Sequence, residues 1–591
     1  MRPLLLAAAV VFAVALGVYL VTLAPTVGLT DSGELTVAAW AHGNAHPPGF
    51  PLYLLLTHLF TLLPIRSVAW RVNFASAFFA ALACGAMVFA VASMTARRSG
   101  ITVAVFAGLM LAFSRTLWNY ATVAEVYALN TFLIVAMLAL VLAWYRTRAD
   151  RLLYAAAFVF GLGLCVHHVT VGLCIAGIAA LAWRADKKQI VICALFAIAA
   201  LSIYAYLPIA ASHNPPLNWG DPDSLGRFVD HVTGKQYRGY LQSSSGQFAA
   251  MLGLLGRDLG PIALLLALWG VIQLWRTERP LFLFVVLLAA ADLAWAAFYP
   301  IANDRDAYLL PAIIAIVLAA AYGAATMARG RLAWALLLVP LLAAVFAYPQ
   351  RDRGRFLVPK LYAENALRQM RPNALLLTSD WQLYAPLMYF QEVEHARPDV
   401  IAVETGMLNR PWYVEQLERR QPALMQAVKP QLDAYRPVLN AWESDNALKP
   451  RMFTLVADLI QAMIETRLAA NQPVYATTEF VAGKEPVLVP MLRTLGAKYP
   501  LLPQGVLVEY NGTQPQPLNV DLEGLAGAYQ EDDPVLTEVL PAYRSALLMR
   551  GRYMALRRRY DDAAAAYKLA QSLDPENPTI QRELVAVEAM R

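Results

Sequence analysis

Charged side chains are scarce in this chain of 591 residues. Only 15% of the residues are Asp, Glu, Lys or Arg and 59% are hydrophobic, whereas soluble proteins usually carry about 25% charged residues. The hydrophobic residues gather in runs of roughly 20, the length that crosses a bilayer as a helix. The composition excludes an ordinary soluble protein and predicts a multi-pass α-helical membrane protein.

Cysteine is scarce as well. The four cysteines all fall inside hydrophobic runs, and no two have the spacing of metal ligands: Cys84, Cys165, Cys174 and Cys193. The pattern therefore indicates no disulfide framework. Packing is the simplest role for these residues.

Several common catalytic signatures are missing from the sequence. It contains no Walker loop, no G-x-G-x-x-G, no H-E-x-x-H and no nucleophile elbow. Their absence disfavours nucleotide, zinc and acyl chemistry. No nucleic-acid partner is expected either.

The hydrophobic runs predict about 11 transmembrane helices. They cover residues 3–23, 68–95, 101–117, 126–145, 152–167, 169–184, 189–209, 258–275, 280–299, 308–328 and 332–348. The first run is long and Pro25 follows its plausible cleavage residue, so we expect an uncleaved helix rather than a signal peptide. Residues 50–64 are too short to span comfortably and predict a re-entrant or interfacial helix.

Basic residues mark every second turn between these runs. The turns are 97–98, 146–151, 184–188, 276–279 and 329–331. Because short basic turns stay cytoplasmic, the N-terminus is expected inside and the region after Tyr348 outside. Alanine-rich helices with such turns are typical of a bacterial inner membrane.

The composition becomes ordinary after Tyr348, which predicts a second and a third domain. The expected domains are a transmembrane domain (1–349), an extracytoplasmic α/β domain (350–535) and a helical tail (536–591). Short buried strands are predicted at 374–378, 400–403 and 474–476, with helical patterns between them. The tail resembles a tetratricopeptide unit, whose paired helices end at a proline, although a helical hairpin capping the domain is an equal alternative.

Two carboxylates and a histidine follow the first hydrophobic run. Asp31 and Glu34 are three residues apart, so a helix would place them on one face, and His46 precedes the rigid bend of Pro47-Pro48. A carboxylate that takes a proton from a hydroxyl needs fixed placement and partial desolvation. Asp31 is therefore a candidate general base, with a simple helix cap as an equal alternative.

Further polar residues lie in turns on the same expected side of the membrane. They are Asn303 to Tyr308, Asn218-Trp219-Gly220-Asp221, Glu125 and His167-His168. The guanidinium of Arg305 is able to bind a phosphate with two hydrogen bonds, or else forms a weak surface pair with Asp306. Asn218, Trp219 and Asp221 suit a sugar site, but residues of these types also build ordinary turns.

These motifs closely resemble a known family. The residues that carry the resemblance are Thr30 to Glu34, His46 to Tyr53, Arg71 to Phe74, Glu125 to Asn130, Gly161 to His168, Asn218 to Pro222, Asp380, Tyr389 to Gln391 and Arg397 to Val400. The family includes the human protein O-mannosyltransferase acting on IPT domains, and bacterial relatives long labelled as a domain of unknown function. The resemblance spans most of residues 25–410 and implies a GT-C glycosyltransferase.

The resemblance also implies roles for individual residues. Asp31 takes the position of the base that activates the acceptor hydroxyl, with Glu34 as the second choice, and His46 and Arg305 become candidates for the donor phosphate. The donor would be a polyprenyl-phosphate sugar, a co-substrate rather than a cofactor, and the acceptor a protein or glycan. No metal is expected, because the leaving phosphate carries its own charge. One direct attack at the anomeric carbon would invert its configuration.

Two other classes of protein remain open. A transporter or flippase usually shows repeated halves and broken helices near the bilayer midplane, and the sequence shows neither. A scaffold for envelope assembly would grip partners through the C-terminal region but would not need Asp31 and His46. The sugar, the acceptor, the polyprenol and the oligomeric state stay undetermined.

Overall fold

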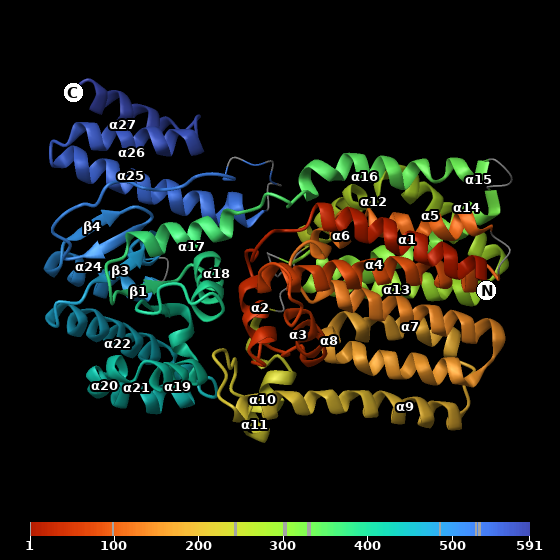
Figure 1. Cartoon of the computed structure of the whole chain (residues 1–591). Coiled ribbons are helices and arrows are strands. Elements are labelled where there is room, and N and C mark those ends of the chain that lie inside the picture. The colour runs from red at the N-terminus through yellow and green to blue at the C-terminus, as the bar shows by residue number, and fades with distance from the viewer. Residues whose placement is uncertain are drawn as a thin grey trace. The chain divides into compact units, whose positions relative to one another are not determined.

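The structure is a computed structural model that describes residues 2–96, 100–240, 245–299, 304–327, 332–483, 486–525, 527, 529 and 533–591. The chain divides into two compact units. One comprises Met1–Val27 with Leu35–Arg355 and is called the helical unit below; the other comprises Gly28–Glu34 with Phe356–Arg591 and is called the C-terminal unit. Figure 1 shows the elements of both.

The first part of the chain is almost entirely α-helical (Figure 1). Its helices are α1 (Arg2–Val21), α2 (Ser32–Trp40), α3 (Pro51–Thr61), α4 (Val68–Met94), α5 (Ile101–Ala112), α6 (Arg115–Ala121), α7 (Tyr127–Thr147), α8 (Asp150–Ala182), α9 (Lys187–Leu201), α10 (Tyr206–Ser212), α11 (Leu225–Val232), α12 (Ser245–Thr277), α13 (Arg279–Phe298), α14 (Leu310–Met327), α15 (Leu332–Ala335) and α16 (Leu338–Arg351). Helices α4 and α14 are enclosed by their neighbours, whereas α16 is largely exposed. An exposed apolar helix of this kind is suited to a lipid surface.

Nine helices of the described residues are long and apolar enough to cross a membrane, or ten if the bent pair α5 and α6 forms one span. The predicted count of about 11 is reached when the pair α5 and α6 is taken as one span and α8 as two. The sequence predicts two helices there, and the structure has one 33-residue segment whose backbone leaves the helical region at His167 (φ −145°, ψ 90°). A Cβ at Gly163 would lie 2.9 Å from the Val171 side chain, which a straight helix rising 1.5 Å per residue would not allow. The two halves of α8 therefore fold back on each other at His167.

Helix α3 confirms the short helix expected between residues 50 and 64. It has 11 residues and begins at Pro51, where the missing N–H of proline costs nothing. At 1.5 Å per residue it is too short to cross a bilayer. The predicted basic turns at 97–98 and 329–331 lie outside the described residues, as does Asn303.

The C-terminal unit contains a five-stranded sheet. The strands are β1 (Leu375–Thr378), β2 (Ile401–Glu404), β3 (Val474–Thr477), β4 (Leu501–Gln504) and β5 (Leu507–Tyr510), in the order β2-β1-β3-β5-β4. The first three are parallel, and β4 and β5 form an antiparallel hairpin at one edge. The expected α/β domain is confirmed with its three predicted strands, although the sequence analysis missed β4 and β5.

Helices flank this sheet and follow it. They are α17 (Val358–Gln369), α18 (Trp381–Glu392), α19 (Pro411–Arg420), α20 (Pro422–Ala427), α21 (Lys429–Ala441), α22 (Lys449–Ala469), α23 (Thr478–Val481), α24 (Val489–Lys498), α25 (Leu540–Leu556), α26 (Tyr560–Leu573) and α27 (Pro578–Glu588). All four residues of β1 are buried. A strand buried on both faces reads as an unbroken apolar run, which is why Leu375 to Leu377 were recognisable in the sequence.

The last three helices stack in sequence order (Figure 1). Met554 of α25 packs with Ala563 and Tyr567 of α26 and with Leu584 of α27. Helix α25 also reaches the sheet, because the Arg550 guanidinium donates to the Pro503 carbonyl. The helices expected in the tail are present, and their likeness to a tetratricopeptide unit stays a prediction.

Candidate functional site

The loop Gly28–Glu34 belongs to the C-terminal unit, where it contacts the first turn of α18. The indole Nε1 of Trp381 donates a hydrogen bond to Asp31 Oδ1 at 3.1 Å. The backbone N–H of Thr30 donates to Gln382 Oε1 at 2.9 Å. Thr30 has a left-handed backbone (φ 54°), a conformation that needs support from its surroundings in a residue with a branched Cβ. The two hydrogen bonds from α18 supply that support and orient the Asp31 carboxylate.

Gly33 allows this close approach. A Cβ at this position would lie 2.1 Å from the carbonyl oxygen of Ala385 in α18. No side chain fits in that space, so glycine is required by packing rather than by backbone conformation. The backbone of the loop therefore lies directly against α18.

Asp31 and Glu34 lie close together at the beginning of α2. Their carboxylate oxygens lie within 4.8 Å of one another; Glu34 is fully buried and Asp31 is half-buried. Asp31 immediately precedes the first residue of α2, so the cap predicted as an alternative fits its position. Paired carboxylates of this kind are suited to proton transfer, and they are also ligands that a divalent cation prefers.

Helix α18 is itself fixed by Asp380, directly after β1. Asp380 Oδ1 accepts hydrogen bonds from the backbone N–H groups of Gln382 and Leu383, and its other oxygen accepts one from the Tyr362 hydroxyl. This is an N-cap at the carboxyl end of a parallel strand, the edge at which α/β folds bind ligands. The cap sets the direction of the turn that presents Trp381.

The Asp380 carboxyl is 3% exposed. Burial raises its pKa to about 6, against the lowering effect of the Tyr362 hydrogen bond, and the charge of Glu479 raises it further. Because this pKa is higher in the folded than in the unfolded chain, the folded state gains stability from protonation. That gain is fully present below about pH 4 and is lost as the pH rises through 6.

The variant Asp380→Asn tests this assignment. Asparagine keeps the acceptor oxygen of the cap but does not titrate. The melting temperature of the wild-type full-length protein should therefore fall relative to that of Asp380→Asn between pH 4 and 7, by the equivalent of about 3 kcal/mol at most. Thermal unfolding in detergent across this pH range measures it. Parallel profiles for the two proteins would contradict the assignment.

In the helical unit, the segment around His46 is joined to the turn Asn218–Asp221. The Asn44 backbone N–H donates to Leu217 O, and Trp219 N–H donates back to Asn44 O. The Asn44 amide also donates to Asn218 Oδ1, and the Asn218 amide donates to Asp221 Oδ1. The polar groups of Asn218 and Asp221 thus build the turn, as the alternative to a sugar site predicts. Their part in sugar binding stays a prediction.

His46 and Trp219 lie beside each other, and the segments that carry them pack against the buried His231. Their ring centroids are 6.0 Å apart. A Cβ at Gly49 (φ 90°) or at Gly220 (φ 75°) would come within 2.9 Å of a ring nitrogen of His231, so His231 fills the space between the two segments. Burial lowers the pKa of His231 to about 3, and its imidazole is therefore neutral at physiological pH. His231 therefore packs between the segments that carry His46 and Trp219.

A second group in the helical unit joins α6, α7 and the residues before α14. The Tyr120 hydroxyl donates to Asp306 Oδ1 at 2.6 Å, and the Tyr127 hydroxyl donates to Asp304 Oδ2 at 3.3 Å. The Nε of Arg305 is buried and makes no hydrogen bond with any described residue. A buried donor without a partner is costly, so the Nε of Arg305 is available to a hydrogen-bond acceptor.

Glu125 lies at the turn between α6 and α7 and is 3% exposed. Its backbone N–H faces the Ser76 hydroxyl at 3.4 Å. The Glu125 side chain lies near those of Tyr53, Tyr120 and Tyr127. The structure thus associates Glu125 with the two tyrosines that bind Asp304 and Asp306.

The sequence analysis named Asp31, Glu34, His46 and Arg305 but missed the residues that hold them. Trp381 and Gln382 stand out only once Asp380 is seen to follow a buried strand, because residues at such strand ends tend to carry function. Tyr120 carries no signal in the sequence and becomes recognisable only through Asp306, which is distant along the chain.

The fold is that of a multi-pass membrane protein of GT-C type, as predicted. The chain is similar to ArnT from Cupriavidus metallidurans in the apo state, with a TM-score of 0.50, 14% sequence identity, and coverage of 86% of this chain and 99% of ArnT. A likeness at this identity establishes the fold, and with it the membrane-spanning architecture.

The resemblance to one family of transferases is confirmed over parts of the chain. Family models described as the N-terminal domain of protein O-mannosyl-transferase TMEM260 and as TMEM260-associated domain 2 match residues 31–191 and 360–434. The TMEM260 protein of Mus musculus is 27% identical over 464 residues, which are 70% of this chain and 64% of the mouse protein. The Dictyostelium discoideum protein is 29% identical over 253 residues, 39% of this chain and 30% of its own. The chain therefore spans less than two thirds of each relative.

Proposed function

We propose that this chain is a membrane glycosyltransferase that moves a sugar, mannose or another hexose, from a polyprenyl-phosphate donor to a hydroxyl of an extracytoplasmic protein or glycan. The observation that carries the proposal is the hydrogen bond from Trp381 to Asp31. It orients a carboxylate at the first residue of the region that matches the transferase family. The names of the relatives support the same class of reaction.

In the proposed reaction, Asp31 takes the proton of the acceptor hydroxyl as its oxygen attacks the anomeric carbon. The bond between that carbon and the phosphate oxygen breaks, and the polyprenyl phosphate leaves with the electron pair. The new glycosidic bond has inverted configuration. A base held in one orientation contributes because the reacting atoms must already be aligned, and Glu34 is the second candidate for this role.

The other predicted residues would bind the donor. Arg305 and His46 would contact the phosphate, and Asn218, Trp219, Asp221 and Glu125 would contact the sugar or acceptor. The buried, unpartnered Nε of Arg305 supports the first role, because a guanidinium binds phosphate with two aligned hydrogen bonds. The pairing of Trp219 with His46 supports the second.

The proposed site of action is a bacterial cytoplasmic membrane. The N-terminus would be cytoplasmic and the C-terminal unit extracytoplasmic, where lipid-linked sugars rather than free nucleotide sugars are expected as donors. The tail α25–α27 would then be available to acceptor proteins. No cofactor is proposed, and no metal.

Sugar transfer in reconstituted membranes tests the proposal. Purified full-length protein, labelled polyprenyl-phosphate mannose and extracytoplasmic proteins should together give labelled protein, with and without a chelator of divalent cations. Other lipid-linked hexoses test the identity of the sugar. Absence of label with every donor would reject the transferase and favour a scaffold or transporter. Loss of label with the chelator alone would assign a cation to Asp31 and Glu34.

Trp381→Phe should lower kcat about 10-fold to 100-fold with little change in donor KM. The variant keeps the aromatic ring but removes the N–H that orients Asp31, and a hydrogen bond to a charged group contributes about 1.5–3 kcal/mol. Steady-state kinetics of transfer measures the effect. Trp442→Phe is the matched control, since it removes an indole hydrogen bond to the Asn409 carbonyl in the same unit. An equal loss in both variants would indicate a general structural effect.

Arg305→Gln should raise the donor KM by about 10-fold or more, with a smaller change in kcat. The substitution removes the guanidinium proposed to bind the phosphate, and charge-assisted hydrogen bonds contribute about 1.5–3 kcal/mol. Arg305→Lys should recover part of the effect, because lysine keeps the charge without the two-point geometry. Kinetics at varied donor concentration measures it, with the exposed Arg276→Gln as control. An unchanged KM would remove Arg305 from the donor site.

A further inference from the structure

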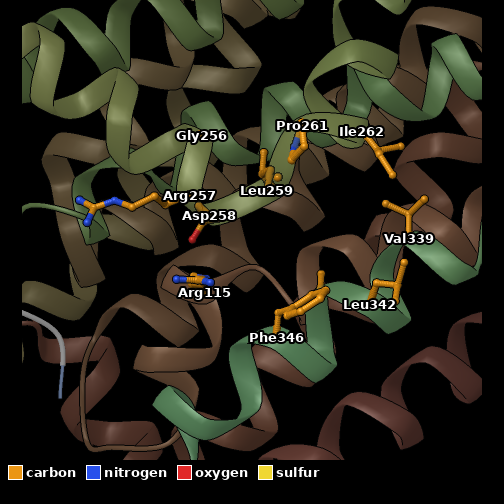
Figure 2. Close-up of a pocket in the computed structure, with 12 residues that line it drawn as sticks. Arg115, Gly256, Arg257, Asp258, Leu259, Pro261, Ile262, Val339, Leu342 and Phe346 are labelled. Carbon is orange, nitrogen blue, oxygen red and sulfur yellow. The ribbon is translucent and has the colours of Figure 1, made fainter. Parts of the chain in front are cut away.

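Helix α12 is broken at a point that adjoins a cavity. Gly260 has φ 75° and ψ 165°, a conformation confined to glycine, and Pro261 follows it. The cavity has a volume of about 410 Å³ and is lined by Arg115 at the start of α6, by residues 256–262 of α12 and by residues of α16 (Figure 2). A volume of this size is enough for a small ligand or a lipid headgroup.

One side of the cavity is apolar. Val339, Leu342 and Phe346 of α16 and Ile262 of α12 form this wall (Figure 2). Phe346 is 70% exposed and Leu342 is 49% exposed. Both lie on helix α16, within the segment Ala333–Arg351 that is long and apolar enough to cross a membrane. In a membrane protein, exposed apolar side chains of this kind contact the hydrocarbon chains of lipids.

The other side of the cavity carries opposite charges. Asp258 points toward Arg115 (Figure 2), and within the described ranges the two side chains form no ion pair. Arg115 donates instead to Gln350 Oε1 at 3.1 Å. The exposed side chain of Arg257 extends away from Asp258. The cavity therefore has a cation, Arg115, and an anion, Asp258, in its lining, and the two are not paired with each other.

The Asp258 carboxylate is only half satisfied. Its Oδ1 accepts a hydrogen bond from the Thr116 backbone N–H at 2.6 Å and so caps α6. Its Oδ2 is buried, makes no hydrogen bond with the described residues, and the residue is 6% exposed. A buried ionised carboxylate needs partners for both oxygens. Asp258 also belongs to a helix that is long and apolar enough to cross a membrane, and an ionisable residue in such a helix indicates function. A cationic donor in the cavity would complete the bonding of Asp258.

We propose that this cavity binds the headgroup of a phosphatidylethanolamine molecule. The ammonium group would donate to Asp258 Oδ2, the phosphate would bind the Arg115 guanidinium, and the acyl chains would cover the wall formed by α16. A phosphatidylcholine headgroup has no N–H to donate to Asp258. A polyprenyl phosphate carries no cation of its own, so it would add a second anion beside Asp258 and leave Asp258 Oδ2 without a donor. The charges of the cavity therefore match a zwitterionic headgroup with an N–H donor. The proposal does not depend on sugar transfer, because its test measures binding.

Native mass spectrometry of the delipidated full-length protein tests the proposal. Phosphatidylethanolamine, phosphatidylcholine, phosphatidylglycerol and polyprenyl phosphate are titrated separately, and the first should bind at least 10-fold more tightly than the second. Asp258→Asn keeps the oxygen that caps α6 and should reduce phosphatidylethanolamine binding at least 10-fold, as should Arg115→Gln. The matched controls are Asp150→Asn and Arg184→Gln, two exposed residues of the helical unit that do not line the cavity, and they should bind as wild type does.

Two results would overturn the proposal. One is equal binding of phosphatidylethanolamine by wild type, Asp258→Asn and Arg115→Gln, provided that all three melt at similar temperatures. The other is a preference for polyprenyl phosphate or phosphatidylcholine over phosphatidylethanolamine, which would assign the cavity to a different lipid. If a variant fails to fold, the ranking of the four lipids on the wild-type protein decides whether the proposal holds.

Discussion

Asp31→Asn should lower the rate of sugar transfer by about 10²-fold to 10⁴-fold, the usual contribution of a general base. Asparagine is unable to accept the proton of the acceptor hydroxyl. It does keep an oxygen that can accept the hydrogen bond now made by Trp381 to Asp31, so the loop should remain on α18 and the protein should remain folded. Initial rates in reconstituted membranes, with melting temperatures measured in parallel, separate the chemical effect from a structural one.

Glu34 provides the comparison for this result. Glu34 is fully buried and lies close to Asp31. If Asp31 is the base, Glu34→Gln should reduce the rate less than Asp31→Asn does. Asp223→Asn, at an exposed position in the helical unit, should have no effect. A rate for Asp31→Asn equal to that of wild type would remove Asp31 from the mechanism. If Glu34→Gln then abolished transfer, Glu34 would be the base.

Gly33→Ala should abolish activity by displacing the loop rather than by removing a reactive group. The added methyl would lie 2.1 Å from the Ala385 carbonyl oxygen, and a backbone atom of a helix is not easily moved. Relief requires that the loop leave α18, which would break the hydrogen bonds to Trp381 and Gln382. Overpacking of this kind costs about 1–3 kcal/mol, so a small decrease in melting temperature should accompany a large loss of transfer.

The matched control is Gly496→Ala in α24 of the same unit. A Cβ there would meet no atom within 4 Å, and alanine favours a helix more than glycine does. Gly496→Ala should therefore keep full activity and melt at the same or a slightly higher temperature. Full activity in Gly33→Ala would show that the contact between the loop and α18 is not needed for transfer.

The membrane-spanning helices were predictable because bilayer thickness imposes a length on apolar runs. The prediction was least accurate at residues 101–117, where one expected run became the pair α5 and α6 with a bend of 64°. The break of α8 at His167, by contrast, falls between the two helices that were predicted there. Strand β4 was missed because Pro503 interrupts the pattern expected of a strand, and β5 was missed because Glu509 interrupts its apolar run.

The site was predictable only as a set of residue types. The sequence indicated Asp31 because a carboxylate after an apolar run is unusual, but it gave no sign that Trp381 binds it. The two residues are 350 positions apart, and neither periodicity nor local propensity carries information over that distance. Likewise, the sequence left open whether Asn218 binds a sugar or builds a turn; its hydrogen bond to Asp221 shows that it takes part in the turn, and its part in sugar binding stays a prediction.

The docking of Gly28–Glu34 on α18 has a consequence for the order in which the protein matures. A chain is synthesised from its N-terminus at about 5–20 residues per second, so the segment with Asp31 emerges long before Trp381 and Gln382 exist. Until they do, this segment lacks the surface that fixes its backbone. A chain that stops after Arg355 would retain Asp31 without its partners. In the proposed transferase, competence for catalysis should therefore appear only late in synthesis, and an incomplete chain should not react with the donor lipid.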